Sequence, residues 1–161
     1  MTLMDLGGLL SNAVTIVGLP FAIFIFLYEQ RKARQNEEDE VFQLLSDNYQ
    51  DFLKVVLDQP DLRLFSISST ADLSEEQKER MLIIFNMLMS LFERAYLLVY
   101  DKRMSAKQRR RWHSWEDYMR EWCRREDFQE LLPQLLRGED PDFVAYIKKL
   151  VEQETRGQSA S

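Results

Sequence analysis

The sequence has few of the residues on which most metal sites, disulfide frameworks and turn-rich folds depend. Among its 161 residues there are one cysteine, Cys123, and one histidine, His113. A single cysteine excludes an internal disulfide framework, and a single histidine excludes most zinc and di-iron arrangements. Only five glycines and four prolines are present, which argues against a turn-rich β-sandwich and against glycine-rich phosphate-binding loops. The sequence predicts no metal, no cofactor and no catalytic residue.

The chain also lacks the excess of basic residues that nucleic-acid-binding proteins usually carry. Its formal net charge is −6 and its isoelectric point is about 4.9, so we expect no nucleic-acid partner. Charge is nevertheless segregated, because the segment 37–80 is acidic and the segment 102–125 is basic. Such segments commonly compensate each other across a helical bundle. Hydrophobic residues make up 45% of the chain, which is enough to build a core.

A long uncharged stretch runs from Leu6 to Tyr28. As a helix it would be about 34 Å long, enough to cross a hydrocarbon core of about 30 Å. A secretory signal peptide does not fit, because the preceding residues include an acid and no base and no small-residue cleavage site follows. A buried core helix is the other alternative, but residues 13–28 are apolar around the whole helix. We therefore predict a transmembrane helix over 6–28, kinked or loosened at Pro20.

The flanks of this stretch indicate its orientation. The residues before it contain Asp5 and no base, whereas Arg31, Lys32 and Arg34 follow it. Positively charged flanks stay in the cytoplasm. We therefore expect a single-pass protein of the plasma (inner) membrane, with a short external N-terminus over 1–5 and a cytoplasmic domain over 29–154.

Helical periodicity resumes after the predicted membrane span. Apolar residues at steps of three and four form a heptad-like seam that predicts a helix from about residue 29 to Leu57: Phe42, Leu45, Tyr49, Phe52 and Val56. Capping-box sequences begin at Ser74 and Ser105 and predict helices to about Tyr100 and Arg125. A short amphipathic segment over 128–136 and a last helix from Pro141 complete an all-α bundle of about four helices.

The remaining segments between 29 and 161 are predicted to be irregular. Residues 59–73 are expected to form a loop, in which the run LRLFSIS could form a short extended piece. Residues 155–161 have the composition of a flexible tail.

The apolar run over 81–100 is a possible second membrane span. Glu93 and Arg94 lie near its centre, and each costs about 2.5–3.5 kcal/mol on insertion scales. A second crossing would also place the basic residues that follow it outside the membrane, against the usual charge rule. We interpret this segment as the central helix of the cytoplasmic bundle.

Three phrases of the sequence resemble a broad group of bacterial proteins. They are YEQRKARQ after the predicted span, FNMLMSLFERAYLLVYDKRMS, and QRRRWHSWEDYMREW. Together they are similar to single-pass, membrane-anchored helical proteins of a domain-of-unknown-function family. The resemblance covers most of residues 8–135 and implies a membrane-anchored helical domain. It implies no activity.

One face of the predicted helix over 111–125 is aromatic. Trp112, Trp115, Met119 and Trp122 follow at helical spacing, which favours core packing and leaves membrane-interface contact as the alternative. His113 lies four residues before Asp117, and the two could share a hydrogen bond on the helix surface. Because adjacent helical residues point about 100° apart, His113 and Ser114 cannot act as base and nucleophile.

Two further groups of polar residues are candidate sites. Asn86, Ser90 and Glu93 form a line along the central helix. We interpret them as a buried polar network with a structural role, and a seam that faces a partner is the alternative. A charge between apolar turns needs a partner, so we expect Glu93 to contribute more to stability than Glu116 on the next helix. The second group is a basic turn that could touch the membrane surface, together with the tryptophan beside it: Lys102, Arg103, Lys107, Arg109, Arg110, Arg111 and Trp112.

These observations favour a non-enzymatic, membrane-tethered interaction or scaffold module. Its partners would be the lipid bilayer and either another protein or a second copy of the chain, with no small-molecule substrate. A third hypothesis, an enzyme, would need an unrecognised site around Glu93 and His113. The main alternative is a membrane-surface sensor. In that hypothesis a helix over 29–58 extends about 45 Å from the bilayer and the helix over 75–101 returns about 40 Å, which brings the basic turn 102–111 to anionic headgroups.

Overall fold

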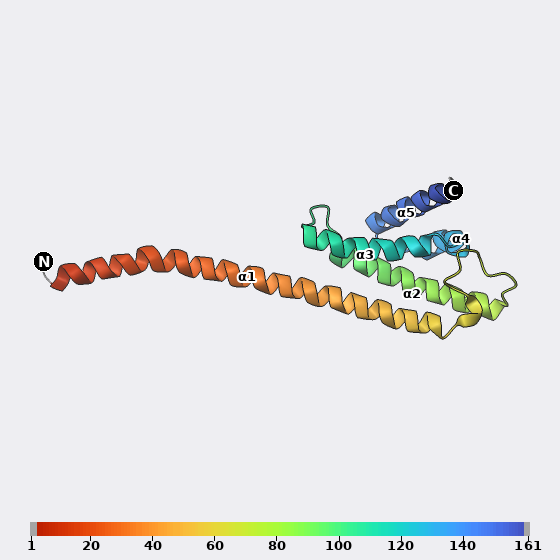
Figure 1. Cartoon of the computed structure of the whole chain (residues 1–161), viewed down its shortest axis with the longest axis horizontal. Coiled ribbons are helices and arrows are strands. Elements are labelled where there is room, and N and C mark those ends of the chain that lie inside the picture. Colours follow the sequence, from red (N-terminus) through yellow and green to blue (C-terminus); the bar gives the residue numbers. More distant parts are fainter. Residues whose placement is uncertain (1–2, 160–161) are drawn as a thin grey trace. The chain divides into compact units, whose positions relative to one another are not determined.

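The computed structural model describes the backbone of residues 3–159 and the side chains of residues 21–157 (Figure 1). Every regular element in this part of the chain is helical, which confirms the all-α prediction. The elements are α1 (Leu3–Leu57), a 3-10 helix η1 (Pro60–Leu62), α2 (Glu75–Val99), α3 (Ala106–Cys123), α4 (Glu126–Leu135) and α5 (Pro141–Ser159).

The chain divides into two compact units, and the boundary between them lies between Val41 and Phe42, inside α1. The first unit is helical from Leu3 onward, and its backbone stays helical through Pro20. The predicted external segment 1–5 and the side chains of the first part of the predicted transmembrane helix lie outside the described residues. From Phe21 to Tyr28 the side chains are described, and all of them are exposed.

The core of the second unit is aromatic and joins helices that are far apart in sequence. The heptad-like seam of α1 is confirmed from Leu45 onward, because Leu45, Tyr49, Phe52 and Val56 are buried, whereas Phe42 is half-buried. These residues meet α3: the ring centroids of Tyr49 and Trp115 are 5.8 Å apart, and those of Phe52 and Trp122 are 5.6 Å apart. Figure 1 shows α2 and α3 side by side in this unit, with α4 folded back at the end of α3 and α5 over α3.

Helix α2 is central to the second unit and is also apolar enough, by length and composition, to cross a membrane. No other helix in the described part of the chain meets that test. One arc of α2 faces the core and is buried: Met81, Ile84, Phe85, Leu88, Met89, Leu91, Phe92 and Ala95. About 39% of the apolar window is buried, so much of this helix surface remains open.

The predicted starts of α2 and α3 are confirmed. The Ser74 hydroxyl accepts from the backbone N–H of Gln77, and the Gln77 side chain accepts from the backbone N–H of Ser74. Ser105 and Gln108 form the same reciprocal pair at the start of α3. Each pair satisfies two donors that a helix start leaves without partners.

The loop over 59–73 contains a 3-10 turn rather than the short extended piece that its sequence suggested. Pro60 begins the turn, and Arg63 ends it with a left-handed backbone at φ 47°. An extended segment needs a second strand to pair with, and the loop instead bonds to the start of α4. The Glu126 backbone N–H donates to the Ile67 carbonyl, and the Ser69 N–H donates to the Glu126 carboxylate at 3.1 Å.

The C-terminal part has more helix than predicted. The segment expected over 128–136 is a full helix, α4, with Pro133 in its last turn. The described part of the second unit therefore has five α-helical segments, including the end of α1, rather than about four. Helix α5 extends to Ser159, past the predicted boundary at 154 and into the predicted flexible tail. The Thr155 hydroxyl donates to the Val151 carbonyl one turn earlier, and no proline interrupts the helix there.

Candidate interaction surface

The side of α2 that faces away from the core is apolar at several positions. We call the residues Ile83, Met87, Ser90, Arg94 and Leu97 the outer stripe, because steps of four and three place them along one line of the helix. Ile83 is 54% exposed, Met87 44% and Leu97 56%, and the neighbouring Leu98 is 57% exposed. Exposed apolar side chains grouped in this way are typical of a binding surface rather than of scattered surface residues.

A groove of about 260 Å³ runs beside the outer stripe, between α2 and the last part of α1. Met87, Ser90 and Arg94 line it from α2, and Asn48 and Asp51 line it from α1. The floor is apolar, with Phe52, Val55 and Leu91. The groove therefore combines an apolar floor with one cation and one carboxylate at its edges.

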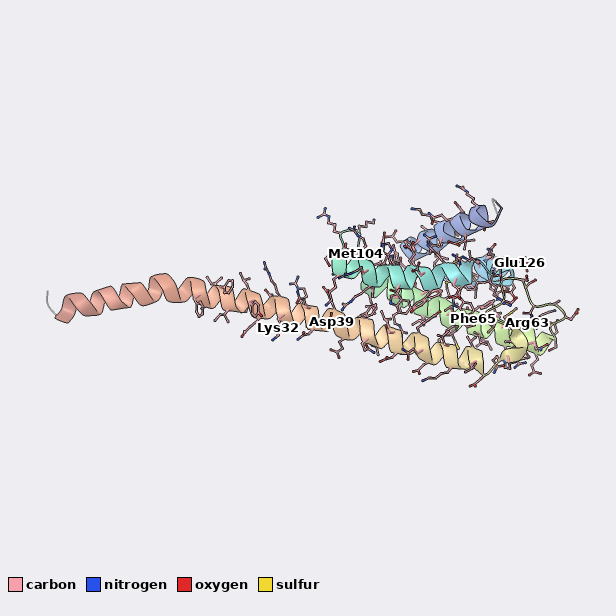
Figure 2. All side chains as sticks on the ribbon, viewed as in Figure 1. Lys32, Asp39, Arg63, Phe65, Met104 and Glu126 are labelled. Carbon is pink, nitrogen blue, oxygen red and sulfur yellow. The ribbon has the colours of Figure 1, made fainter. Side chains whose placement is uncertain are left out.

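A second apolar surface lies where α1 meets the following loop. Leu57 is 77% exposed, and Phe65 is 58% exposed although its ring lies 5.4 Å from that of Trp122. These residues line a groove of about 770 Å³ with Pro60 and Arg63. Figure 2 shows Arg63, Phe65 and Glu126 at one end of the second unit and Met104, in the turn between α2 and α3, at the other.

The predicted basic turn is exposed at this Met104 end. Lys102, Arg103, Lys107, Arg109 and Arg110 are exposed, whereas Arg111 is half-buried with its guanidinium carbon 5.0 Å from the centre of the Phe42 ring. The first turn of α3 holds no acidic residue. Bases at a helix start oppose the helix dipole, so this arrangement is unfavourable for the stability of α3.

Trp112 does not belong to this surface. It is 2% exposed, and its indole N–H donates to the Tyr146 hydroxyl at 3.0 Å. Trp115, Met119 and Trp122 are also buried, which confirms core packing for the aromatic face of α3. The prediction that Trp112 meets the membrane surface is wrong, because α5 covers that side of α3 and places Tyr146 against the indole.

The prediction that Asn86, Ser90 and Glu93 form a buried polar line on α2 is wrong for Asn86 and Ser90. Asn86 and Ser90 are exposed, and the Asn86 amide donates to the Leu82 carbonyl of its own helix at 2.7 Å. The physical reason is that α2 turns a different arc toward the core. That arc carries Phe85, Leu88 and Phe92, and it lies about a quarter turn around the helix from Asn86 and Ser90.

Glu93 lies at the edge of the buried arc of α2 and contacts the residues just before α5. Its carboxylate accepts from the backbone N–H of Asp140 at 2.5 Å, directly before α5. It also lies against the Glu139 carboxyl group. Burial and the hydrogen bond and charge of Glu93 raise the pKa of Glu139 to about 7, because two adjacent carboxylates resist carrying two negative charges.

Glu116, which we expected to matter less than Glu93, has more partners. Its carboxylate accepts from Arg120 at 2.5 Å and from the Tyr146 hydroxyl. Arg120 continues the network to Glu154 at 2.9 Å. Burial alone would raise the pKa of Glu116, but these hydrogen bonds and charges lower it overall. Glu116 is therefore held by more groups than Glu93, and the order of their contributions to stability stays a prediction.

The most deeply buried ionic group was not predicted. Arg125 is 2% exposed and pairs with Asp127, which is 6% exposed. The guanidinium also donates to the carbonyls of Arg63 and Ser66, each at 2.8 Å, and to the Thr70 hydroxyl. The only sequence signal is the run of charges at Arg125, Glu126 and Asp127, at the junction of two predicted helices.

The structure assigns no catalytic geometry to the remaining candidates. His113 and Ser114 are both exposed on α3, and the Ser114 hydroxyl is directed to the Arg110 carbonyl. Within the described residues, no group of histidine, cysteine and carboxylate side chains could hold a metal ion.

Comparison with protein-family models, curated proteins and solved structures finds no match to this chain. The resemblance to a membrane-anchored family stays a prediction.

Proposed function

We propose that the chain is a single-pass protein of a bacterial inner membrane whose cytoplasmic helical unit is a non-enzymatic docking module for another protein chain. The observation that carries the proposal is the outer stripe of α2. Two arcs of α2 carry large apolar side chains, and apolar helix faces are normally covered, yet only one arc of α2 is covered within the unit. A docked partner would cover the other arc.

The first unit supports the membrane part of the proposal. From Phe21 to Tyr28 every side chain is apolar or aromatic, and the large ones are between 40% and 65% exposed. Exposed aromatic and aliphatic side chains on every side of a helix favour lipid over water. Arg31, Lys32 and Arg34 follow, so the second unit is assigned to the cytoplasm.

Two experiments test this proposal in the full chain in its membrane. A reporter fused after Ser161 is expected to behave as cytoplasmic, and an exported reporter would contradict the topology. A photo-crosslinking residue at Met87 is expected to capture another polypeptide, while the same residue at the exposed Lys148 of α5 serves as the control. Equal capture at both positions, or none at Met87, would contradict the docking role.

A second candidate function rests on the basic turn. The exposed bases Lys102, Arg103, Lys107, Arg109 and Arg110 stand at a helix start that disfavours them. An anionic lipid surface would offset this cost, since each base near such a surface gains about 1 kcal/mol. This favours contact between the turn and anionic headgroups.

The lipid hypothesis is tested with residues 30–161, once circular dichroism shows that the fragment is folded. We expect binding to vesicles that contain anionic lipid, weaker binding at higher salt, and loss of binding when Arg109, Arg110 and Arg111 become glutamine. As a control, Lys148→Gln with Lys149→Gln removes exposed charge from α5. Equal binding to vesicles with and without anionic lipid would exclude this function.

A further inference from the structure

The start of α5 is held against α2 by a carboxylate. Asp140 comes directly before α5, and its backbone N–H donates to the Glu93 carboxylate of α2 at 2.5 Å. The Asp140 carboxylate in turn accepts from the backbone N–H groups of Asp142 and Phe143, at 2.9 and 3.1 Å. The residue that caps α5 therefore also ties this helix to α2.

A third carboxyl group lies at the same joint. Glu139 is half-buried, and its side chain forms a hydrogen bond with that of Glu93. Two carboxyl groups can share a hydrogen bond only while one of them carries a proton, which Glu139 then donates to the Glu93 carboxylate. When the proton is lost, Glu93, Glu139 and Asp140 place three negative charges at one turn. The joint is therefore favourable with the proton and unfavourable without it.

In the described part of the chain, no base forms an ion pair with any of these three carboxyl groups. Arg94 and Arg137 are the bases nearest to them in the sequence, and both side chains are exposed and form no ion pair with a described residue. Burial and the Glu93 side chain are the causes that act on Glu139. On α2, one turn after the joint, burial and negative charges that include Asp142 and Asp140 raise the pKa of Tyr96.

The groups of α3 that hold α5 mostly keep their charge near neutral pH. Burial alone would raise the pKa of Glu116 and of Glu154, but hydrogen bonds and neighbouring charges lower both. Arg120 links these two carboxylates, at 2.5 and 2.9 Å. The exposed His113 is the exception, because it acts on Glu116 through its charge and histidine is the residue type that changes charge between pH 5 and 8.

Helix α5 covers the aromatic face of α3. The ring of Tyr146 lies 5.6 Å from that of Trp112 and accepts its indole N–H, and Phe143 and Ile147 are fully buried. The chain enters α5 through Gly138, whose φ of 89° is left-handed and is unstrained for glycine. Helices α2 and α3 also contact each other and α4, so α5 can move about this turn while the other helices stay packed.

We propose that α5 is a pH-dependent strap, which a proton held between the Glu93 and Glu139 carboxyl groups closes over the aromatic face of α3 and which loss of that proton loosens. The loosened strap would uncover Trp112. This inference goes beyond the proposed docking function and depends on neither the membrane span nor a partner.

The size of the effect follows from the two states of Glu139. Closing the strap raises the pKa of this group from 4.5 to about 7, so the closed form binds the proton more tightly than the open form. Closure is therefore most favourable below pH 4.5, weakens as the pH rises from 4.5 to 7, and changes little above pH 7. For these two pKa values the ratio of open to closed strap rises about tenfold between pH 6 and pH 8.

Hydrogen exchange of the full chain in detergent tests the strap directly. Protection of the backbone N–H groups of α5, corrected for the chemical exchange rate at each pH, is expected to fall about tenfold between pH 6 and pH 8. Protection of the buried arc of α2, at Phe85, Leu88 and Phe92, should stay constant over the same range. Equal protection of α5 at both pH values would overturn the proposal, and so would a parallel fall in α2, since the whole unit would then respond.

Two variants identify the carboxyl pair as the cause. Glu139→Gln supplies an uncharged donor to Glu93 at every pH, so protection of α5 is expected to be the same at pH 6 and pH 8. Glu93→Gln removes the neighbouring charge and should shrink the tenfold change. A residue with only a structural role would alter protection without altering its dependence on pH.

Two control variants keep the carboxyl pair. Glu130→Gln removes an exposed acid from α4, and His113→Gln removes the other group beside α5 that changes charge in this range. Both are expected to retain the tenfold change. Retention of the change in Glu139→Gln, or its loss in His113→Gln, would overturn the assignment of the strap to Glu93 and Glu139.

Discussion

The guanidinium of Arg125 forms a two-point ion pair with Asp127: Nε lies 2.5 Å from Oδ1, and Nη2 lies 2.7 Å from Oδ2. The same guanidinium holds two carbonyl groups of the loop between α1 and α2. One buried side chain therefore connects the end of α3 with a loop about sixty residues earlier. Such a group is costly to bury alone but is strongly stabilised when all of its partners are present.

We expect Arg125→Met to lower the free energy of unfolding by about 3–5 kcal/mol, because it leaves the Asp127 carboxylate and two loop carbonyls buried without a donor. For a chain of this size that is a fall in the midpoint of thermal unfolding of roughly 6–20 °C. The measurement is thermal unfolding of the full chain in detergent, with the exposed Arg137→Met as control. Equal midpoints for the two variants would contradict the role of Arg125.

The Glu93 and Glu139 pair predicts a dependence of stability on pH. The pKa of Glu139 is raised from 4.5 to about 7 in the folded chain, so the folded state holds a proton that the unfolded state releases at lower pH. The contribution of this group to stability is greatest below pH 4.5, falls as the pH rises from 4.5 to 7, and stays low above pH 7.

Glu139→Gln keeps the hydrogen-bonding shape and removes this titration. Relative to the unsubstituted chain, we expect the variant to be equally stable at pH 4.5 and more stable at pH 8, by on the order of 2 kcal/mol. Thermal unfolding at a series of pH values measures the difference. The exposed Glu130→Gln on α4 is the control, and a difference that does not change with pH would exclude the proposed pair.

The contact between Tyr146 and Glu116 joins α5 to α3. It should contribute more to the free energy of unfolding than the packing of the tyrosine ring alone. Tyr146→Phe removes a hydrogen bond to a carboxylate and the acceptor of the Trp112 N–H. We expect a loss of about 1.5–3 kcal/mol, and the free-energy effects of Tyr146→Phe and Glu116→Gln should not add in the double variant. Tyr100→Phe, which keeps its stacking on Tyr96, is the control. Additive effects would show that the two groups act independently.

The thiol of Cys123 should be unreactive in the folded chain. Its side chain is fully buried, and burial raises the pKa of the thiol to about 12. Because the thiolate is the reactive form, we expect no labelling by a maleimide at pH 7.5 until the chain unfolds. Lys148→Cys on the exposed side of α5 supplies a reactive comparison. Rapid labelling of native Cys123 would contradict the packing of α3 against its neighbours.

Features that depend on neighbouring residues were predictable from the sequence. The capping boxes at Ser74 and Ser105, and the seam of Leu45, Tyr49, Phe52 and Val56, depend on spacings of three and four residues. Such spacings act within one helix and do not need knowledge of the rest of the chain. The all-helical class and the aromatic face of α3 follow from the same local patterns.

The tertiary structure decided which side of each helix is covered and which distant groups meet. Helix α2 is apolar on two arcs, so its sequence alone could not say that Phe85 faces the core while Ser90 faces away. The partner of Glu93 is another acid, Glu139, and the partners of Arg125 are carbonyl groups of a distant loop. Such contacts depend on how helices and loops pack, because the favourable energy arises only when groups from different segments are buried together.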